Sequence, residues 1–275
     1  MNPRRSDLPV DDDRTRSVTQ VVSGKVEKMK AALFIPCYVD AVFPDVGVAT
    51  LELLERFGVE VDYPLNQTCC GQPMANSGCH ADAAAAEALF VKNFAGYDYI
   101  VGPSGSCVHH VRENLTAIPQ TPETTKVRRS TYELVEFLHD VLNAREFPWA
   151  EFPHTVGLHN GCASLRALRT AKMTEIEEPF FSKPLDLLEK VKGIRFVTPE
   201  RPDECCGFGG TFSVFEEPVS AKMGYDKVND HHKAGAEYIV SADMSCIMHQ
   251  QGCAERLGLP IKFIHIAQIL NGARA

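Results

Sequence analysis

Cysteine is the residue whose number and spacing in this sequence most clearly predict chemistry. The chain has 275 residues and ten cysteines, and eight of the ten follow one pattern that occurs twice. In each copy a single cysteine is followed by a Cys-Cys-Gly triplet and then by a Ser-Cys pair, which indicates an internal duplication. The first cysteine set is Cys37, Cys69, Cys70 and Cys107, and the second cysteine set is Cys162, Cys205, Cys206 and Cys246.

Each set of four thiols is expected to bind a metal centre. Thiolates are soft ligands that suit zinc or iron–sulfur clusters. Structural zinc sites usually take ligands from close pairs of the type Cys-x₂₋₄-Cys, whereas these sets combine adjacent cysteines with long separations. Neighbouring thiolates can bind different irons of one cluster, so the spacing favours up to two iron–sulfur clusters. Zinc in one of the two sites stays open as an alternative.

Composition limits the other classes of function. A net charge of −8 and a pI near 5.7 argue against a nucleic-acid partner, because such proteins usually carry a basic surface. No apolar run approaches the ~18–20 residues that span a bilayer. Residues 1–28 contain Arg4 and Arg5 but no apolar segment after them, so we expect a solvated tail rather than a secretion signal. Cysteines in such a chain are expected to be ligands rather than disulfides, and the expected location is cytoplasmic.

The elements that must position the cysteines alternate between strand and helix. Short apolar runs predict strands at residues 31–35, 59–63 and 99–101 in the first half, and at 156–159, 194–198, 238–240 and 261–263 in the second. Helical spacing falls between them, at 46–57, 81–94, 185–191, 220–234 and 266–270. Residues 118–129 look like a loop, and 132–142 like a helix.

This alternation predicts an α/β fold made of two tandem, duplicated halves, each with a parallel sheet. The expected division is a tail at 1–28, a first repeat at 29–150 and a second repeat at 151–275. Every cysteine of the two sets follows a predicted strand, and ligand sites in parallel sheets form at the carboxyl ends of the strands. We therefore expect the four thiols of each half to converge at one edge of its sheet.

Glycines and polar residues lie beside the cysteines. Gly71, Gly207, Gly209 and Gly210 are expected to let the backbone approach the bound group and donate N–H groups to its sulfurs. Their spacing is not that of a nucleotide-binding loop. His159 and Asp243 are weak candidates for proton donors or substrate contacts, and ordinary hydrogen bonding is the alternative role for both. Cys79 and Cys253 lie outside the two sets and are interpreted as incidental thiols.

Five segments of the chain carry a family resemblance: CCGQPMANSG (69–78), PSGSC (103–107), ECCGFGGTFSV (204–214), ADMSC (242–246) and HIAQIL (265–270). Through them the chain resembles the CCG-domain (cysteine-rich domain) iron–sulfur proteins over about residues 30–270. That family includes subunits of heterodisulfide reductase, of glycolate oxidase and of anaerobic glycerol-3-phosphate dehydrogenase. Within it, the chain is most similar to the lactate-utilisation branch.

The resemblance implies an iron–sulfur subunit, with [4Fe–4S] clusters, that supports the oxidation of L-lactate to pyruvate. It also implies two companion proteins, one of them with ferredoxin-like clusters. In heterodisulfide reductase relatives each cysteine set ends in Cys-x-x-Cys, whereas here the endings are Cys107-Val-His-His110 and Cys246-Ile-Met-His249. Imidazole can bind cluster iron, so His110 and His249 are possible ligands. Local hydrogen bonding is the alternative role for both.

Three functions follow from these observations. The first is an electron-transfer subunit of a lactate-oxidising complex, or of one that oxidises glycolate or another 2-hydroxy acid. The chain lacks the Cys-x₂-Cys-x₂-Cys-x₃-Cys-Pro run of ferredoxins, so it needs redox partners. The second is a thiol/disulfide oxidoreductase like heterodisulfide reductase. The third is a zinc-stabilised assembly module without redox chemistry.

Overall fold

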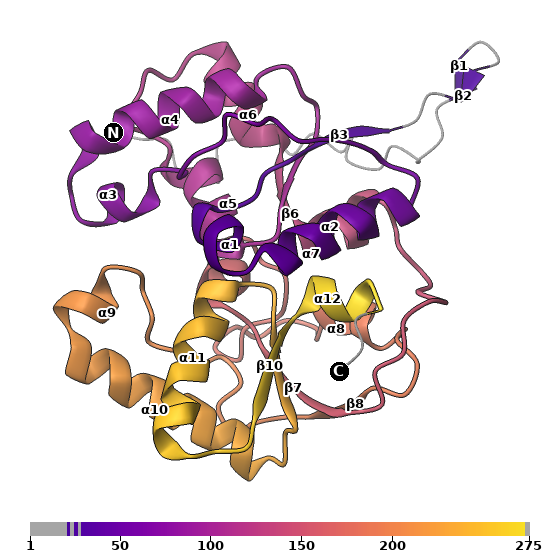
Figure 1. The fold of residues 1–275 in the computed structure, drawn as a ribbon, viewed down its shortest axis with the longest axis vertical. Coiled ribbons are helices and arrows are strands. Elements are labelled where there is room, and N and C mark those ends of the chain that lie inside the picture. Colours follow the sequence, from indigo (N-terminus) through magenta and orange to yellow (C-terminus); the bar gives the residue numbers. More distant parts are fainter. Residues whose placement is uncertain (1–20, 23–24, 27–28, 273–275) are drawn as a thin grey trace.

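The protein consists of two parallel sheets that share one topology (Figure 1). The computed structural model describes Val21–Val22, Lys25–Val26 and residues 29–272. The first sheet contains β3 (Lys30–Leu33), β4 (Glu60–Asp62), β5 (Ile100–Gly102) and β6 (Thr131–Glu133), in the order β4-β3-β5-β6. The second contains β7 (Thr155–His159), β8 (Arg195–Val197), β9 (Tyr238–Ser241) and β10 (Lys262–His265), in the order β8-β7-β9-β10.

The two orders are the same when the strands are numbered within each half, and all neighbouring strands in both sheets are parallel. The predicted fold class, two duplicated α/β halves, is therefore confirmed. The predicted tail lies mostly outside the described residues. Within it, β1 (Val21–Val22) and β2 (Lys25–Val26) form an antiparallel pair.

Helices cover both sheets, and at least one helix follows each strand of the two sheets. None of those in the described part of the chain is long and apolar enough to cross a membrane. In the first half they are α1 (Cys37–Val42), α2 (Pro44–Arg56), α3 (Gln72–Asn76), α4 (His80–Phe94), α5 (Gly105–His109), the π-helix η2 (His110–Asn114), α6 (Pro122–Ser130), α7 (Leu134–Glu136) and the π-helix η3 (Phe137–Val141). In the second half they are the π-helix η4 (Ala163–Ala167), α8 (Lys183–Leu188), α9 (Phe212–Phe215), α10 (Glu217–Lys233), α11 (Met244–Leu257) and α12 (Ile266–Leu270).

The largest hydrophobic core joins the two halves. Helix α2 packs against α12, and α7 packs against α8, so that these four helices lie between the two sheets (Figure 1). Leu53 and Leu54 of α2 and Leu270 of α12 are fully buried in this core. Burying a leucine side chain stabilises a fold by roughly 1.5–3 kcal/mol. The shared core therefore fixes the position of one half relative to the other.

The structure differs from the sequence-based expectation around residues 118–142. Residues 122–129, expected in a loop, belong to helix α6, which begins after the Thr121 cap and buries Val127. The expected helix at 132–142 begins only at Leu134, because residues 131–133 form strand β6, which completes the first sheet. Neither segment shows a clear hydrophobic period, because α6 is strongly polar and β6 has only three residues.

Candidate metal centres

The cysteines lie where the strand order of each sheet reverses. After β3 the chain continues to β4 on one side of the β3–β5 pair, and after β5 it continues to β6 on the other side. Ligands of parallel sheets bind at such a switch point, at the carboxyl ends of the strands. Cys37 begins α1 directly after β3, and Cys107 lies in α5 directly after β5. In the second half Cys162 follows β7 and Cys246 lies in α11 after β9. Both cysteine sets therefore lie at equivalent switch points of the two sheets.

The four thiols of the first set form a continuous chain of contacts. The Cys37 thiol hydrogen-bonds to Cys69, Cys69 contacts Cys70, and Cys70 contacts Cys107. Hydrogen bonds from the thiols of Cys37 and Cys70 lower the pKa of Cys69 to about 2. Because the Cys37 thiol donates this hydrogen bond and is partly buried, its protonated form is favoured and the pKa of Cys37 is raised. The set thus favours one thiolate supported by neighbouring thiols.

The second cysteine set repeats this arrangement. Cys162 hydrogen-bonds to Cys205, Cys205 contacts Cys206, and Cys206 contacts Cys246. Hydrogen bonds from Cys162 and Cys206 lower the pKa of Cys205 to about 2. These sulfurs are soft donors gathered in one place, which fits a thiophilic metal ion or an iron–sulfur cluster.

Burial follows the same order in both sets. The first cysteine of each set is exposed, and the first cysteine of each Cys-Cys-Gly triplet is half-buried. The remaining two thiols are buried, with 3% and 6% exposure for Cys70 and Cys107 and 2% and 8% for Cys206 and Cys246. A group bound by all four thiols would have one side in the protein interior and one side near the surface.

The glycine of each triplet turns its N–H toward the first cysteine of that triplet. The amides of Gly71 and Gly207 donate to Sγ of Cys69 and Cys205, with N···S distances of 3.4 Å in both halves. Both glycines have positive φ, 95° and 91°, where L side chains are disfavoured. A Cβ on Gly207 would also lie 2.6 Å from the Ser220 carbonyl oxygen. Gly209 and Gly210 lie in the next turn, also at positive φ.

The two Cys-x-x-His histidines lie beside the thiols in different surroundings. His110 is buried, and its Nε2 lies 3.5 Å from Oε1 of the buried Glu87. His249 Nε2 lies 3.2 Å from the Ser220 carbonyl oxygen and 3.9 Å from the thiol of Cys253. Each ring therefore has a polar protein neighbour next to the cysteine set.

His159 lies beside two thiols of the second cysteine set. A ring nitrogen of His159 and the sulfurs of Cys206 and Cys246 all lie within 4.8 Å of one another, and all three residues are buried. Among residues 29–272, the first cysteine set forms no trio this compact. Burial lowers the pKa of His159 well below its ordinary value, so the ring is neutral and can act as a ligand.

Asp243 lies between the two cysteine sets rather than in one of them. Its carboxylate accepts hydrogen bonds from Tyr38 in α1, from the Ser106 amide and from the amide and hydroxyl of Ser245, at 2.6–3.1 Å. Tyr38 directly follows Cys37, and Ser106 and Ser245 directly precede Cys107 and Cys246. Asp243 therefore ties together backbone segments that carry thiols of both sets.

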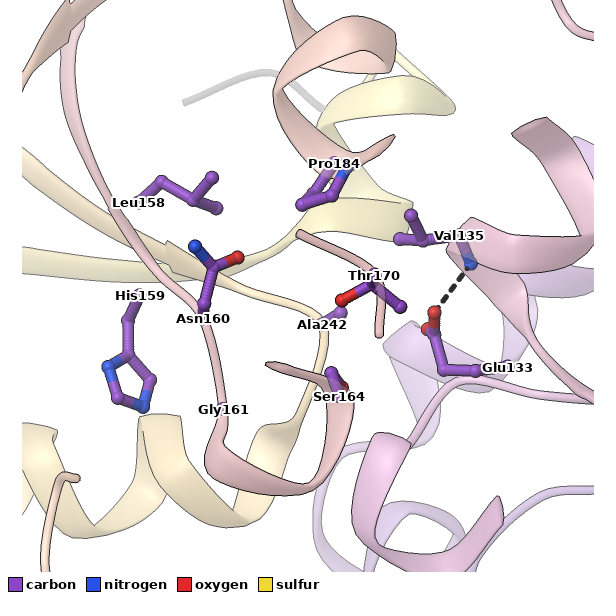
Figure 2. A pocket seen from close by; sticks show the side chains of 10 residues that line it. All are labelled: Glu133, Val135, Leu158, His159, Asn160, Gly161, Ser164, Thr170, Pro184 and Ala242. Atoms are coloured by element: carbon purple, nitrogen blue, oxygen red, sulfur yellow. Dashed lines mark hydrogen bonds between the residues drawn. The ribbon is translucent and has the colours of Figure 1, made fainter. Parts of the chain in front are cut away.

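A small cavity lies beside His159 and is lined from both halves (Figure 2). Its volume is about 10 Å³, which is the space of about one water molecule and too small for an organic acid. Figure 2 shows His159 on the side of this cavity opposite Glu133 and Thr170, with its ring pointing away from both of them. A cavity of about 450 Å³ lies at the opposite end of the second sheet, beside the first residues of β9 and β10.

Sequence reasoning missed four polar residues near the thiols: the half-buried Tyr38 and the buried Glu87, Lys227 and His231. The last three lie on long helices with mixed composition, where a charged or polar side chain is usually solvated. Tyr38 follows a ligand candidate directly, and that position was the one available signal.

Comparison with known proteins gives the class that this fold and these sites define. The family model described as the cysteine-rich domain, CCG, matches the chain twice, over residues 31–112 and 156–250. The two matches contain the two cysteine sets. The chain belongs to this cysteine-rich domain family, and the family resemblance seen in the sequence is confirmed.

The curated relatives place it more narrowly within that class. The chain is 42% identical over 247 residues to lactate utilization protein A of Halalkalibacterium halodurans, covering 88% of this chain and 97% of the relative. The protein of the same name from Geobacillus thermodenitrificans is 40% identical, with 88% and 99% coverage. A solved structure of a hypothetical protein from Helicobacter pylori has a TM-score of 0.53 and 12% identity, covering 92% of this chain and 51% of that one. That likeness shows the fold alone.

Proposed function

We propose that this chain is the iron–sulfur electron-transfer subunit of a cytoplasmic complex that oxidises L-lactate to pyruvate. One observation carries the proposal: eight thiols form two matching four-thiol groups at the switch points of two parallel sheets. The substrate is taken from the relatives, whose printed name is lactate utilization protein A.

The first cysteine set would hold one [4Fe–4S] cluster and the second set another, with zinc in one site as the alternative. When bound, such a cluster accepts and passes single electrons. The residues around it set its environment: the buried thiols shield one side, and the N–H groups of Gly71 and Gly207 hydrogen-bond to ligand sulfurs. Hydrogen bonds to ligand sulfurs and burial are the means by which a protein tunes cluster potential.

Electron transfer also requires partners. Oxidation of lactate to pyruvate releases two electrons and two protons, which need an acceptor beyond this chain. We propose two companion lactate-utilisation proteins, one with ferredoxin-like clusters, that meet this chain near the exposed Cys37 and Cys162. The chain's role is thus that of an oxidoreductase subunit.

The test is anaerobic purification followed by iron, sulfide and zinc analysis and by EPR. The proposal predicts iron and sulfide in the purified chain, and an EPR change on adding L-lactate that requires the companion proteins. Glycolate in place of lactate tests the substrate. Stoichiometric zinc in both sites without iron would instead indicate an assembly module, and turnover of disulfide substrates by the chain alone would indicate a thiol/disulfide oxidoreductase.

A further inference from the structure

One buried position, three residues before the first cysteine of each set, is apolar in the first half and polar in the second. Phe34 precedes Cys37 by three residues at the end of the β3 segment, and His159 precedes Cys162 by three residues at the end of β7. Because β3 and β7 are equivalent strands, these two side chains occupy equivalent places. Both are buried, with exposures of 1% each.

The surroundings of this position change along with it. In the first half Phe34 packs against Phe90 and Phe94 of α4, with ring centroids 4.9 and 6.0 Å away. In the second half, Lys227 and His231 of α10 lie near His159, and burial together with these two basic neighbours lowers the pKa of His159. An aromatic cluster in one half is thus replaced by three buried basic side chains in the other.

Hydrogen bonds satisfy only part of the cluster formed by His159, Lys227 and His231. The Lys227 ammonium donates to the carbonyl oxygens of Arg201 and Pro202, at 2.8 and 3.1 Å. In contrast, neither ring nitrogen of His159 has a hydrogen-bond partner among the described residues. A buried polar group without a partner destabilises the fold, and binding an ion is one way in which such a group is satisfied.

We propose that His159 supplies a nitrogen ligand to the metal centre of the second cysteine set, together with Cys206 and Cys246. This inference rests on the proposed metal binding of that set. The compact trio suits a single metal centre, either one ion or one cluster whose irons each take one of these ligands, because its three ligand atoms lie within 4.8 Å of one another. At the equivalent place in the first half, Phe34 offers no ligand atom. The metal centre of the first cysteine set would then be bound by sulfur alone.

His110 and His249 are the competing sources of a nitrogen ligand. His110 Nε2 faces the Glu87 carboxylate, and His249 Nε2 faces the Ser220 carbonyl oxygen. The His110 ring nitrogens, like those of His159, have no hydrogen-bond partner among the described residues, but neither His110 nor His249 forms a compact trio with two cysteine sulfurs there. His159 has a pair of sulfurs instead, so the geometry assigns the ligand role to it.

The test uses the metal-free full chain titrated with ¹¹³Cd²⁺ alone, a soft probe ion for thiolate and imidazole sites. Proton–cadmium correlation spectra detect histidine ring protons through their coupling to bound cadmium. We expect two cadmium signals, of which one correlates with a histidine ring. The correlation should disappear in His159→Phe, which installs the residue of the first half, and should persist in His231→Phe and in His249→Gln.

The outcomes separate this inference from the proposed function. Two occupied cadmium sites without any histidine correlation would overturn the ligand role of His159 and leave metal binding intact. A correlation that survives His159→Phe but disappears in His249→Gln or His110→Gln would overturn it as well. Failure of cadmium to occupy the second set would contradict the metal site itself. If His159→Phe does not fold, persistence of the correlation in a His110→Gln/His249→Gln double variant supports the assignment, and its loss contradicts it.

Discussion

Ser104 donates a hydrogen bond to Asp243 across the junction of the two halves, with an Oγ···Oδ2 distance of 3.2 Å. The two residues occupy equivalent positions, since each caps the helix that carries the last cysteine of its set. They also form an isolated bridge between the halves. The two cysteine sets are thus joined through a direct contact between their supporting loops.

This contact predicts a strong effect of Asp243→Ala on stability. The substitution would leave the donors of Tyr38, Ser106 and Ser245 without their acceptor in a buried region. We expect the free energy of unfolding to fall by about 2–4 kcal/mol, measured by chemical denaturation. Asp243→Asn keeps the shape and one acceptor oxygen, so its loss should be smaller. A loss below about 0.5 kcal/mol for Asp243→Ala would show that the junction does not depend on this carboxylate.

Alanine substitutions at three glycines should lower stability by different amounts. Gly207→Ala should cost roughly 3 kcal/mol or more and empty the second metal site, because it combines a positive φ with a Cβ 2.6 Å from a backbone oxygen. Gly71→Ala should cost less, since its nearest contact is the Glu87 Cγ at 3.2 Å, which can move. Gly210→Ala is the control: φ is +65° but no atom lies within 4 Å, so about 1 kcal/mol is expected. Equal losses in all three would refute the close-approach argument.

Lys227 predicts a local effect on the second cysteine loop. Lys227→Met would remove the ammonium that holds the carbonyls of Arg201 and Pro202, just before Cys205. We expect faster hydrogen exchange in residues 201–206 and a stability loss of about 1–3 kcal/mol. The matched control is Lys222→Met on the same helix, where the ammonium is exposed and pairs with Asp226; it should change stability by less than about 0.5 kcal/mol. Unchanged exchange in Lys227→Met would contradict the tether.

His265 predicts a pH dependence of stability. Burial lowers the pKa of His265 from 6.5 to about 4. Between these values the unfolded chain binds a proton that the folded chain does not, so stability is lost as the pH falls below 6.5. His265→Asn does not titrate there and can still cap α12.

The variant should therefore lose roughly 2 kcal/mol less than the wild type between about pH 7 and pH 5, measured by urea denaturation at each pH. Parallel curves for the two proteins would mean that His265 is not responsible for acid sensitivity.

Much of the fold could be predicted because strand-forming runs such as residues 99–101 and 238–240 are apolar and repeat. Placing Cys37, Cys107, Cys162 and Cys246 after such strands was enough to predict thiol convergence. Strand β6 was missed because Thr131 and Glu133, though buried, are polar. The contrast between Phe34 and His159 could not be interpreted from the sequence, because Lys227 resembles a solvated residue until its burial is known.

The central claim is that each cysteine set holds its own iron–sulfur group. The most direct measurement is the iron and sulfide content per chain of anaerobically purified wild type, Cys69→Ala and Cys205→Ala. If both sites hold [4Fe–4S] clusters, the wild type contains about eight irons and eight sulfides. Each variant should then lose about half of both, while its circular dichroism stays unchanged. Wild-type protein with stoichiometric zinc and no iron, or a single substitution that empties both sites, would contradict the claim.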